Sequence, residues 1–284
     1  MTEPATFPYR LVATDLDGTL LRSDETISRR TRAALAAARA AGAEHIVVTG
    51  RSVAWTRHIL DDLGYEGLAV CGQGAQLYHA GEHRLLTSVT LDRQLARAAV
   101  ARLEESLGPL HIAANRDGLD GRVVMEAGFH ETVGSTYGAS GEGNPRPERA
   151  GTREELFAEP VIKMYVHHPT MSDDELAATA LDLLGDAVGI VVSGELLVEM
   201  LPLGLTKATG LSLAARRLGV RGSETIAFGD MPNDLPMFAW AARSVAMAGA
   251  HPDVRAMADE ITAGNDEDGI ALVLEPLLGQ PAVG

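Results

Sequence analysis

The 284-residue sequence is poor in cysteine and lysine, and both scarcities narrow its possible functions. Its single cysteine, Cys71, excludes an internal disulfide and a cysteine metal cage, and it fits a reducing compartment. We expect Cys71 to be a buried, inert thiol. Only two of the 24 basic residues are lysines, Lys163 and Lys207, so each lysine is a candidate for a specific role.

The sequence also lacks long apolar runs and a net positive charge. No stretch of about 18 uninterrupted apolar residues occurs, and the first ten residues, MTEPATFPYR, lack the basic and apolar segments of a signal peptide. The net charge of −15 repels phosphate backbones and anionic membranes. We therefore expect a cytoplasmic protein that binds neither nucleic acid nor membranes.

Two parts of the sequence alternate short apolar runs with helical stretches. In the first part, runs at 11–14, 45–50 and 67–72 flank helices expected at 28–42 and 52–63, with Ser28 as N-cap and Gly42 as stop of the first helix. The pattern returns from 206 to 278. Since the apolar runs do not alternate with polar residues, they indicate parallel strands buried on both faces.

The residues between these two parts form a second α/β unit. They contain expected helices at 91–107 and 172–185, strands at 110–116, 121–129, 161–168 and 189–201, and a loop rich in Gly, Pro and charge at 137–155. We therefore predict a doubly wound parallel-sheet, Rossmann-like core at 1–83 and 198–284. An inserted α/β cap domain is predicted at 84–197.

Candidate residues lie at the ends of the predicted core strands or at adjacent helix starts, the edge where open parallel sheets bind ligands. We expect these residues to converge on one pocket: Asp15, Asp17, Thr49, Gly50, Arg51, Lys207, Asp230, Asn233 and Asp234.

A pocket with several ionised Asp side chains requires positive charge. Mg²⁺, which binds one or two carboxylates together with phosphate oxygens, fits this requirement, and Lys207 supplies a fixed charge. The Thr49 hydroxyl and nearby backbone N–H groups are suited to phosphate oxygens. In such a site one carboxylate can attack phosphorus, and a second can transfer the protons.

Four motifs resemble those of the haloacid dehalogenase-like hydrolase superfamily: DLDGTLL, VVTGR, the isolated Lys207 and GDMPND, in this order. The long insertion, together with VEMLPLGLTKATGL and NDEDGIA, is similar to the Cof-type sugar-phosphatase branch. The resemblance implies a Mg²⁺-dependent phosphatase that hydrolyses a small phosphomonoester through an aspartyl-phosphate, with the cap selecting the substrate.

The resemblance also implies a role for each candidate residue. Asp15 would be the nucleophile and a metal ligand. Asp17 would be the general acid/base and would bind the metal through its backbone carbonyl. The remaining roles are Thr49 and Gly50 for the phosphoryl group, Arg51 and Asn233 for phosphate or substrate, Lys207 for charge compensation, Asp230 as metal ligand, and Asp234 for orienting the metal shell or Lys207.

Two segments depart from the pattern of this branch. The chain has Gln73-Gly74-Ala75 where the branch often has Asn-Gly-Ala, and Ala248-Gly249-Ala250 where it often has Gly-Asn-Ala. Both segments are expected beside the site, so the departures concern substrate contacts more than the reaction.

Other functions use part of the same chemistry. A phosphomutase of sugar phosphates forms the same covalent intermediate, and a phospho-accepting regulatory protein also combines strand-end Asp residues with Thr and Lys. Lys163 fits either a solvent-facing strand position or a substrate contact. Sugar phosphates, nucleotide phosphates and phosphorylated cofactors all fit the expected pocket, and no sequence feature indicates the oligomeric state.

Overall fold

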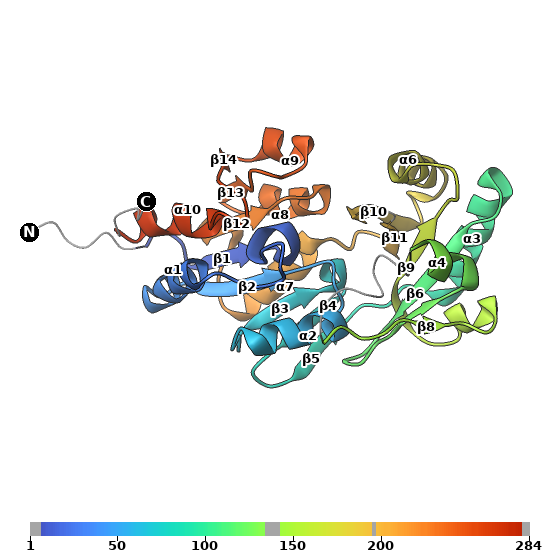
Figure 1. Cartoon of the computed structure of the whole chain (residues 1–284), viewed down its shortest axis with the longest axis horizontal. Coiled ribbons are helices and arrows are strands. Elements are labelled where there is room, and N and C mark those ends of the chain that lie inside the picture. Colours follow the sequence, from blue (N-terminus) through green and yellow to red (C-terminus); the bar gives the residue numbers. More distant parts are fainter. Residues whose placement is uncertain (1–6, 134–142, 195–196, 280–284) are drawn as a thin grey trace, which may run out of the picture.

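Two β-sheets, one in the core and one in the cap, organise the fold (Figure 1). The computed structural model describes residues 7–133, 143–194 and 197–279. The core sheet has the strand order β14-β13-β12-β1-β2-β3-β4-β5. Its strands are β1 (Leu11–Thr14), β2 (Glu44–Val48), β3 (Leu68–Cys71), β4 (Gln76–His79), β5 (Arg84–Ser88), β12 (Thr225–Gly229), β13 (Arg243–Ala246) and β14 (Glu260–Ile261).

Helices cover both faces of the core sheet, which confirms the doubly wound α/β prediction. Neighbouring residues of a strand point to opposite faces, so Val12 packs in one hydrophobic cluster and Leu11 and Ala13 pack in another. The first cluster includes α1 (Arg29–Ala40), α2 (Val53–Asp62) and α10 (Gly269–Leu277). The second includes α7 (Lys207–Arg217), α8 (Leu235–Trp240) and α9 (Pro252–Met257). As predicted, Ser28 caps α1, because its hydroxyl accepts the Thr31 N–H at 3.0 Å.

The direction of winding changes between β1 and β12. From β1 the chain proceeds outward to β2 and β3 on one side, whereas β12 lies on the other side and continues to β13 and β14. These strands are parallel. The carboxyl ends of β1 and β12 therefore lie side by side at a topological switch point, the usual position for a ligand site in such sheets.

The cap sheet has the order β10-β11-β9-β6-β7-β8 and is mostly antiparallel. Its strands are β6 (His111–Arg116), β7 (Val123–Met125), β8 (Glu148–Arg149), β9 (Val161–His167), β10 (Val188–Gly194) and β11 (Leu197–Pro202). Helices α3 (Arg93–Leu107) and α6 (Asp173–Leu184) pack on one face, and α4 (Ala127–Thr132) follows β7. The other face is directed toward the core.

The sheets divide the chain at different positions from the predicted domain boundaries. Strand β5 begins at the residue where the cap was predicted to begin, yet it pairs with β4 in the core sheet. Strand β11, most of which was predicted to belong to the core, pairs with β9 and β10 in the cap. Strand β4 also pairs antiparallel with both β3 and β5, so the core sheet is not wholly parallel. Apolar patterning indicates a strand but not the sheet that the strand joins.

Two segments of the cap differ in part from their expected structure. The strand expected at 121–129 ends at Met125, and helix α4 follows from Ala127. Residues 137–142 of the expected loop and residues 195–196 of the expected strand lie outside the described residues, whereas β8 lies within the range expected to be a loop.

Two features noted in the sequence, the single cysteine and the lack of long apolar runs, have counterparts in the fold. Cys71 is fully buried at the end of β3, and burial raises the pKa of its thiol to about 12, as expected for an inert side chain. Within 7–133, 143–194 and 197–279, every helix is too short or too polar to span a bilayer.

A buried histidine in the core sheet predicts acid sensitivity. His45 lies in β2, where its Nε2 is 2.9 Å from the Thr14 hydroxyl, and burial lowers the pKa of His45 to about 3. The unfolded chain, in which histidine has a pKa near 6.5, takes up a proton first. The contribution of His45 to the free energy of unfolding should therefore fall as pH decreases from about 6.5 toward 3, by roughly 2 kcal/mol between pH 7 and pH 5.

Urea unfolding as a function of pH checks this expectation. His45→Gln should lose the His45 contribution to the slope, roughly 2 kcal/mol between pH 7 and pH 5. The control is His79→Gln, which changes a partly exposed histidine of the same sheet and should retain the slope. An unchanged slope in His45→Gln would assign the acid sensitivity to other groups.

Candidate active site

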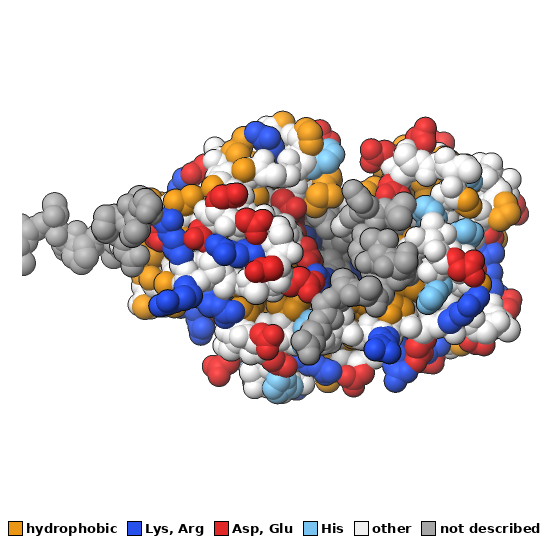
Figure 2. All heavy atoms as spheres, in the orientation of Figure 1, with side chains coloured by type: hydrophobic (Ala, Val, Ile, Leu, Met, Phe, Trp, Pro, Cys, Tyr) orange, Lys and Arg blue, Asp and Glu red, His pale blue; other side chains and the backbone are white. Residues whose placement is uncertain are grey.

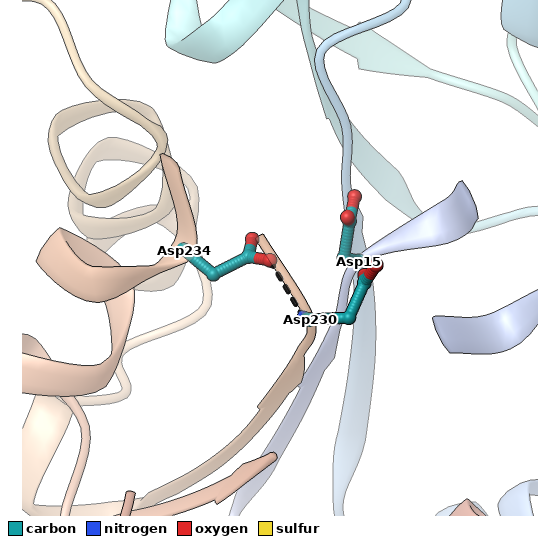
Figure 3. A group of neighbouring side chains, drawn as sticks. All are labelled: Asp15, Asp230 and Asp234. Carbon is teal, nitrogen blue, oxygen red and sulfur yellow. Dashed lines mark hydrogen bonds between the residues drawn. The ribbon is translucent and has the colours of Figure 1, made fainter. Parts of the chain in front are cut away.

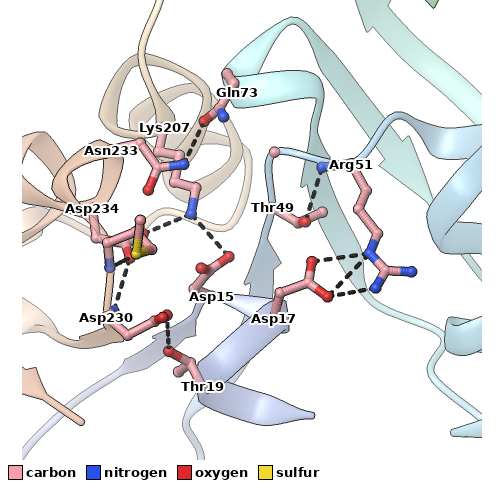
Figure 4. A network of polar contacts seen from close by, with 12 residues as sticks. Asp15, Asp17, Thr19, Thr49, Arg51, Gln73, Lys207, Asp230, Asn233 and Asp234 are labelled. Atoms are coloured by element: carbon pink, nitrogen blue, oxygen red, sulfur yellow. Dashed lines mark hydrogen bonds and ion pairs between the residues drawn. The ribbon is translucent and has the colours of Figure 1, made fainter. Parts of the chain in front are cut away.

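The candidate residues converge at the carboxyl ends of β1, β2 and β12 (Figure 4). Asp15 directly follows β1, and its backbone N–H donates to the Phe228 carbonyl of β12 at 3.0 Å. Asp230 directly follows β12. Adjacent parallel strands thus place the two carboxylates at the switch point of the core sheet.

Lys207 joins two of the acidic residues. Its ammonium lies 2.9 Å from Asp15 Oδ1 and 2.7 Å from Asp234 Oδ1, and all three side chains are buried. Burial alone would lower the pKa of Lys207, but the two carboxylates raise it overall. Lys207 is therefore a permanent positive charge at the first residue of α7.

Negative charge nevertheless exceeds positive charge around Asp15. Burial and, after it, the Asp234 carboxylate raise the pKa of Asp15 well above its usual range, while Lys207 opposes this effect. Burial and Asp234 likewise raise the pKa of Asp230 to about 6. Each carboxylate would be stabilised by an additional cation.

The arrangement of these oxygens fits a divalent cation. Asp15, Asp230 and Asp234 each offer one carboxylate oxygen, and these atoms lie within 4.8 Å of one another (Figure 3). Asp234 is already engaged, because Oδ1 binds Lys207 and Oδ2 accepts the N–H groups of Asp230 and Met231 at 2.9 and 3.0 Å. Asp15 and Asp230 are therefore the better direct ligands, and Asp234 holds the loop that carries Asp230.

Gly18 and Thr19 position Asp230 from the neighbouring loop. The Thr19 hydroxyl donates to Asp230 Oδ1 at 2.8 Å. A Cβ atom on Gly18 would lie 2.4 Å from Asp230 Oδ2, and Gly18 has φ +69°, which favours glycine. Thr19 is not among the residues predicted from the sequence, although its position in DLDGT was a signal.

Asp15 and Asp17 point to different partners despite their spacing. The chain turns over Leu16–Leu20, and only Asp15 contacts Lys207. Asp17 is half-exposed, and its carboxylate accepts from Arg51 Nη2 at 2.5 Å and from Nε at 2.9 Å. Arg51 also pairs with Glu25 at 3.2 Å. In this conformation Arg51 orients Asp17. The predicted contact between Arg51 and substrate would require Arg51 to release Asp17.

Thr49 lies across the site from Lys207 (Figure 4) and behind the surface of the pocket. Thr49 is fully buried, and its hydroxyl oxygen accepts the Arg51 N–H at 3.1 Å, which leaves its own proton available for an oxygen of a ligand. Gly50 borders the pocket.

The Gln73 departure has a structural role at the site. Gln73 is buried with φ +60°, and its Oε1 accepts the Asn233 side-chain N–H at 3.1 Å. Neither Gln73 Nε2 nor Asn233 Oδ1 has a hydrogen-bond partner among the described residues. Gln73 therefore positions Asn233, which lines the pocket. Gly249, the other departure, does not line this pocket.

Core and cap enclose the pocket, which has a volume of about 420 Å³. Figure 2 shows the hollow between the two halves, bordered by acidic side chains of the core. Of the predicted residues, Thr49 and Asp234 lie behind the surface, and the others line the pocket: Asp15, Asp17, Gly50, Arg51, Lys207, Asp230 and Asn233.

The residues that line the pocket also include Lys163 and Glu199 of the cap and Trp55 of the core. The sequence left the role of Lys163 open and did not indicate the other two. Lys163 is 1% exposed, so the solvent-facing alternative is wrong. Its ammonium donates to the Gly50 carbonyl at 2.8 Å and to Glu199 Oε1 at 2.5 Å. The alternation of side chains around Glu199 can be recognised in the sequence. A polar residue at strand spacing, however, usually indicates a solvent-facing position.

Comparisons with known proteins agree with this geometry. The model of the haloacid dehalogenase-like hydrolases matches residues 12–274. An HMP-PP phosphatase of Serratia proteamaculans is 26% identical over 263 residues, covering 89% of each chain. The crystal structure of SMU.1108c from Streptococcus mutans has a TM-score of 0.84 at 22% identity, covering 96% of this chain and 100% of that one. The subclass IIB sugar phosphatase BT4131 has a TM-score of 0.76 at 24% identity, covering 94% and 98%.

Because their sequence identities are only 22% and 24%, these solved structures establish the fold and nothing beyond it. The family match carries the assignment further, because it begins in β1, ends in α10 and includes all four motifs. The chain belongs to the haloacid dehalogenase-like hydrolases, in their Cof-type branch.

Proposed function

We propose that this hydrolase is a Mg²⁺-dependent phosphatase that releases inorganic phosphate from a small phosphomonoester through an aspartyl-phosphate on Asp15. The supporting observation is the position of Asp15 at the pocket, between the Lys207 ammonium and the Asp230 carboxylate. A small-molecule substrate is also supported by the net charge of −15, which disfavours nucleic acid.

The donor set favours a hard cation bound by oxygen. Asp15, Asp230 and the backbone carbonyl of Asp17 would hold Mg²⁺, and Asp234 would orient Lys207 and the loop of Asp230. Bound Mg²⁺ neutralises charge on the phosphoryl oxygens and on the acidic residues.

The chain's own residues then divide the reaction into two steps. An Asp15 carboxylate oxygen attacks phosphorus, and the bond between phosphorus and the leaving oxygen breaks while Asp17 donates a proton to that oxygen. In the second step Asp17 takes a proton from water, and the water oxygen attacks phosphorus and displaces Asp15. Lys207 stabilises the negative charge in both steps, and Thr49 holds a phosphoryl oxygen.

Phosphate release from a substrate panel tests the proposal. The panel should contain sugar phosphates, phosphorylated heterocycles and nitrophenyl phosphate, because similar proteins are named as HMP-PP and sugar phosphatases. We expect multiple turnovers with Mg²⁺, loss of activity with EDTA and recovery with excess Mg²⁺. Turnover that is undiminished by EDTA would contradict the metal assignment.

The same assay separates the alternatives. Isomerised sugar phosphate without free phosphate would favour a phosphomutase. Stable phosphorylation of the protein without turnover would favour a phospho-accepting regulatory protein.

A further inference from the structure

One face of the cap sheet presents an ion pair to the pocket. Residues of β9 and β11 alternate, so Met164, Val166, Val198 and Met200 pack under the cap helices. Lys163 and Glu199 point to the opposite face and line the pocket. The Glu199 Oε1 atom accepts from the Lys163 ammonium at 2.5 Å and from the Ser193 hydroxyl at 2.8 Å.

The second carboxylate oxygen of Glu199, Oε2, is buried and accepts no hydrogen bond among the described residues. Glu199 as a whole is 2% exposed. An unpaired oxygen of a buried carboxylate is costly, because it has lost its hydration without gaining a donor. Since this side chain lines the pocket, an N–H or O–H group of a bound molecule can supply the missing donor.

Lys163 places this oxygen near the reacting end of the pocket. The ammonium that binds Glu199 also donates to the Gly50 carbonyl at 2.8 Å, beside the proposed phosphoryl site. Glu199 is thus one ammonium group away from the Gly50 carbonyl. A donor that reaches it from a bound phosphomonoester must therefore lie close to the ester oxygen.

An apolar wall adjoins the ion pair. Val123 and Met125 of β7 and Phe129 of α4 line the pocket and pack together with Trp55 of the core. Such a wall favours a leaving group with a ring or another apolar face over an extended polar chain.

We propose that Glu199 binds the leaving group, and that the substrates are phosphomonoesters of small ring alcohols with an N–H or O–H donor close to the ester. The inference rests on the proposed phosphatase function. Amino-substituted heterocycles and sugars share this donor chemistry. Glu199 acts on substrate selection, whereas Asp15 and Asp17 carry the reaction.

A set of three ring phosphates tests the inference. Cyclohexyl phosphate lacks a donor, and its two analogues carry a hydroxyl or an amino group on the ring carbon next to the ester carbon. The intact enzyme should prefer both analogues by about 10- to 100-fold in kcat/KM, the range for a hydrogen bond to a charged group. A larger preference for the amine would indicate an amino-substituted leaving group, and equal preferences would indicate a sugar or another polyol.

Glu199→Gln keeps the shape of the side chain and lets the amide oxygen face Lys163, but it replaces the free acceptor by a donor. This variant should bring the preference close to one. The matched control is Ser193→Ala, which removes a partner of the other oxygen and should retain the preference.

The outcomes are distinguishable. Discrimination that is absent in the intact enzyme or retained in Glu199→Gln would overturn the inference. Hydrolysis of nitrophenyl phosphate but of none of the three ring phosphates would overturn the ring-alcohol class. Phosphate release from none of the four compounds would instead contradict the proposed phosphatase.

A second variant excludes a loss of folding as the cause. If Glu199→Gln unfolds at a lower temperature, the double variant Lys163→Met with Glu199→Leu replaces the buried ion pair by apolar side chains of similar size, a change that proteins often tolerate. It should also abolish the preference for donors. A folded double variant that keeps the preference would overturn the role of Glu199.

Discussion

Asp15→Asn should abolish phosphate release, with a loss of at least about 10⁴-fold in kcat, because the amide cannot form the proposed aspartyl-phosphate. The substitution preserves the shape of a side chain that is 5% exposed. It should not unfold the protein, since Lys207 retains Asp234 at 2.7 Å. Burial and Asp234 raise the pKa of Asp15, so removing its charge relieves part of the repulsion within the acidic cluster.

Phosphate release and thermal unfolding check this prediction together. Without Mg²⁺, the unfolding temperature of the variant should equal or exceed that of the unchanged protein. The stabilisation by Mg²⁺ should shrink, because a proposed ligand has lost its charge. The control Asp182→Asn changes an exposed aspartate of α6 and should alter neither property. Turnover within about tenfold of the unchanged enzyme would be incompatible with a nucleophilic Asp15.

The excess of carboxylates at this site connects its stability with its chemistry. Asp15, Asp230 and Asp234 approach one another because β1 and β12 are neighbours, and Lys207 compensates only part of their charge. Burial and, after it, this imbalance raise the pKa values of Asp15 and Asp230. A site that is unfavourable without a cation is well suited to bind a cation together with a phosphate group.

Much of the core and of the site could be predicted from local sequence. Strand β1 is buried at all four positions, which matches its uninterrupted apolar run. The rule that ligands bind at the carboxyl ends of parallel strands then pointed to Asp15, Thr49 and Asp230. The structure brings these residues together as expected, because the apolar strands and the polar residues that follow them can both be recognised within short segments of sequence.

The remaining features depend on contacts between distant segments. Arg51 and Asp17 are 34 residues apart, and their ion pair requires the turn at Gly18. Lys163 and Glu199 lie on different strands of the cap, where polar residues at strand spacing usually face solvent. Their burial follows only from the position of the cap over Gly50, which local patterns do not specify.

Asp17→Asn should separate the two proposed steps, with kcat reduced by about 10² to 10⁴-fold. The reason is chemical: nitrophenolate leaves readily without a donated proton, so the first step should proceed with nitrophenyl phosphate as substrate. The attack of water on the intermediate still needs a base, and an amide cannot act as one. The backbone carbonyl proposed to bind Mg²⁺ is retained.

The variant should therefore release about one equivalent of nitrophenol rapidly and then continue slowly, with one phosphoryl group detectable on the protein by intact mass spectrometry. Glu25→Gln is the matched control, because Glu25 also pairs with Arg51, at 3.2 Å, but would not be a base in the reaction. Its kcat should stay within about threefold, as expected for an exposed ion pair. A variant that turns over slowly without becoming phosphorylated would show that Asp17 acts before the intermediate forms. Turnover at the unchanged rate would remove Asp17 from the mechanism, since no proton transfer in either step would then depend on it.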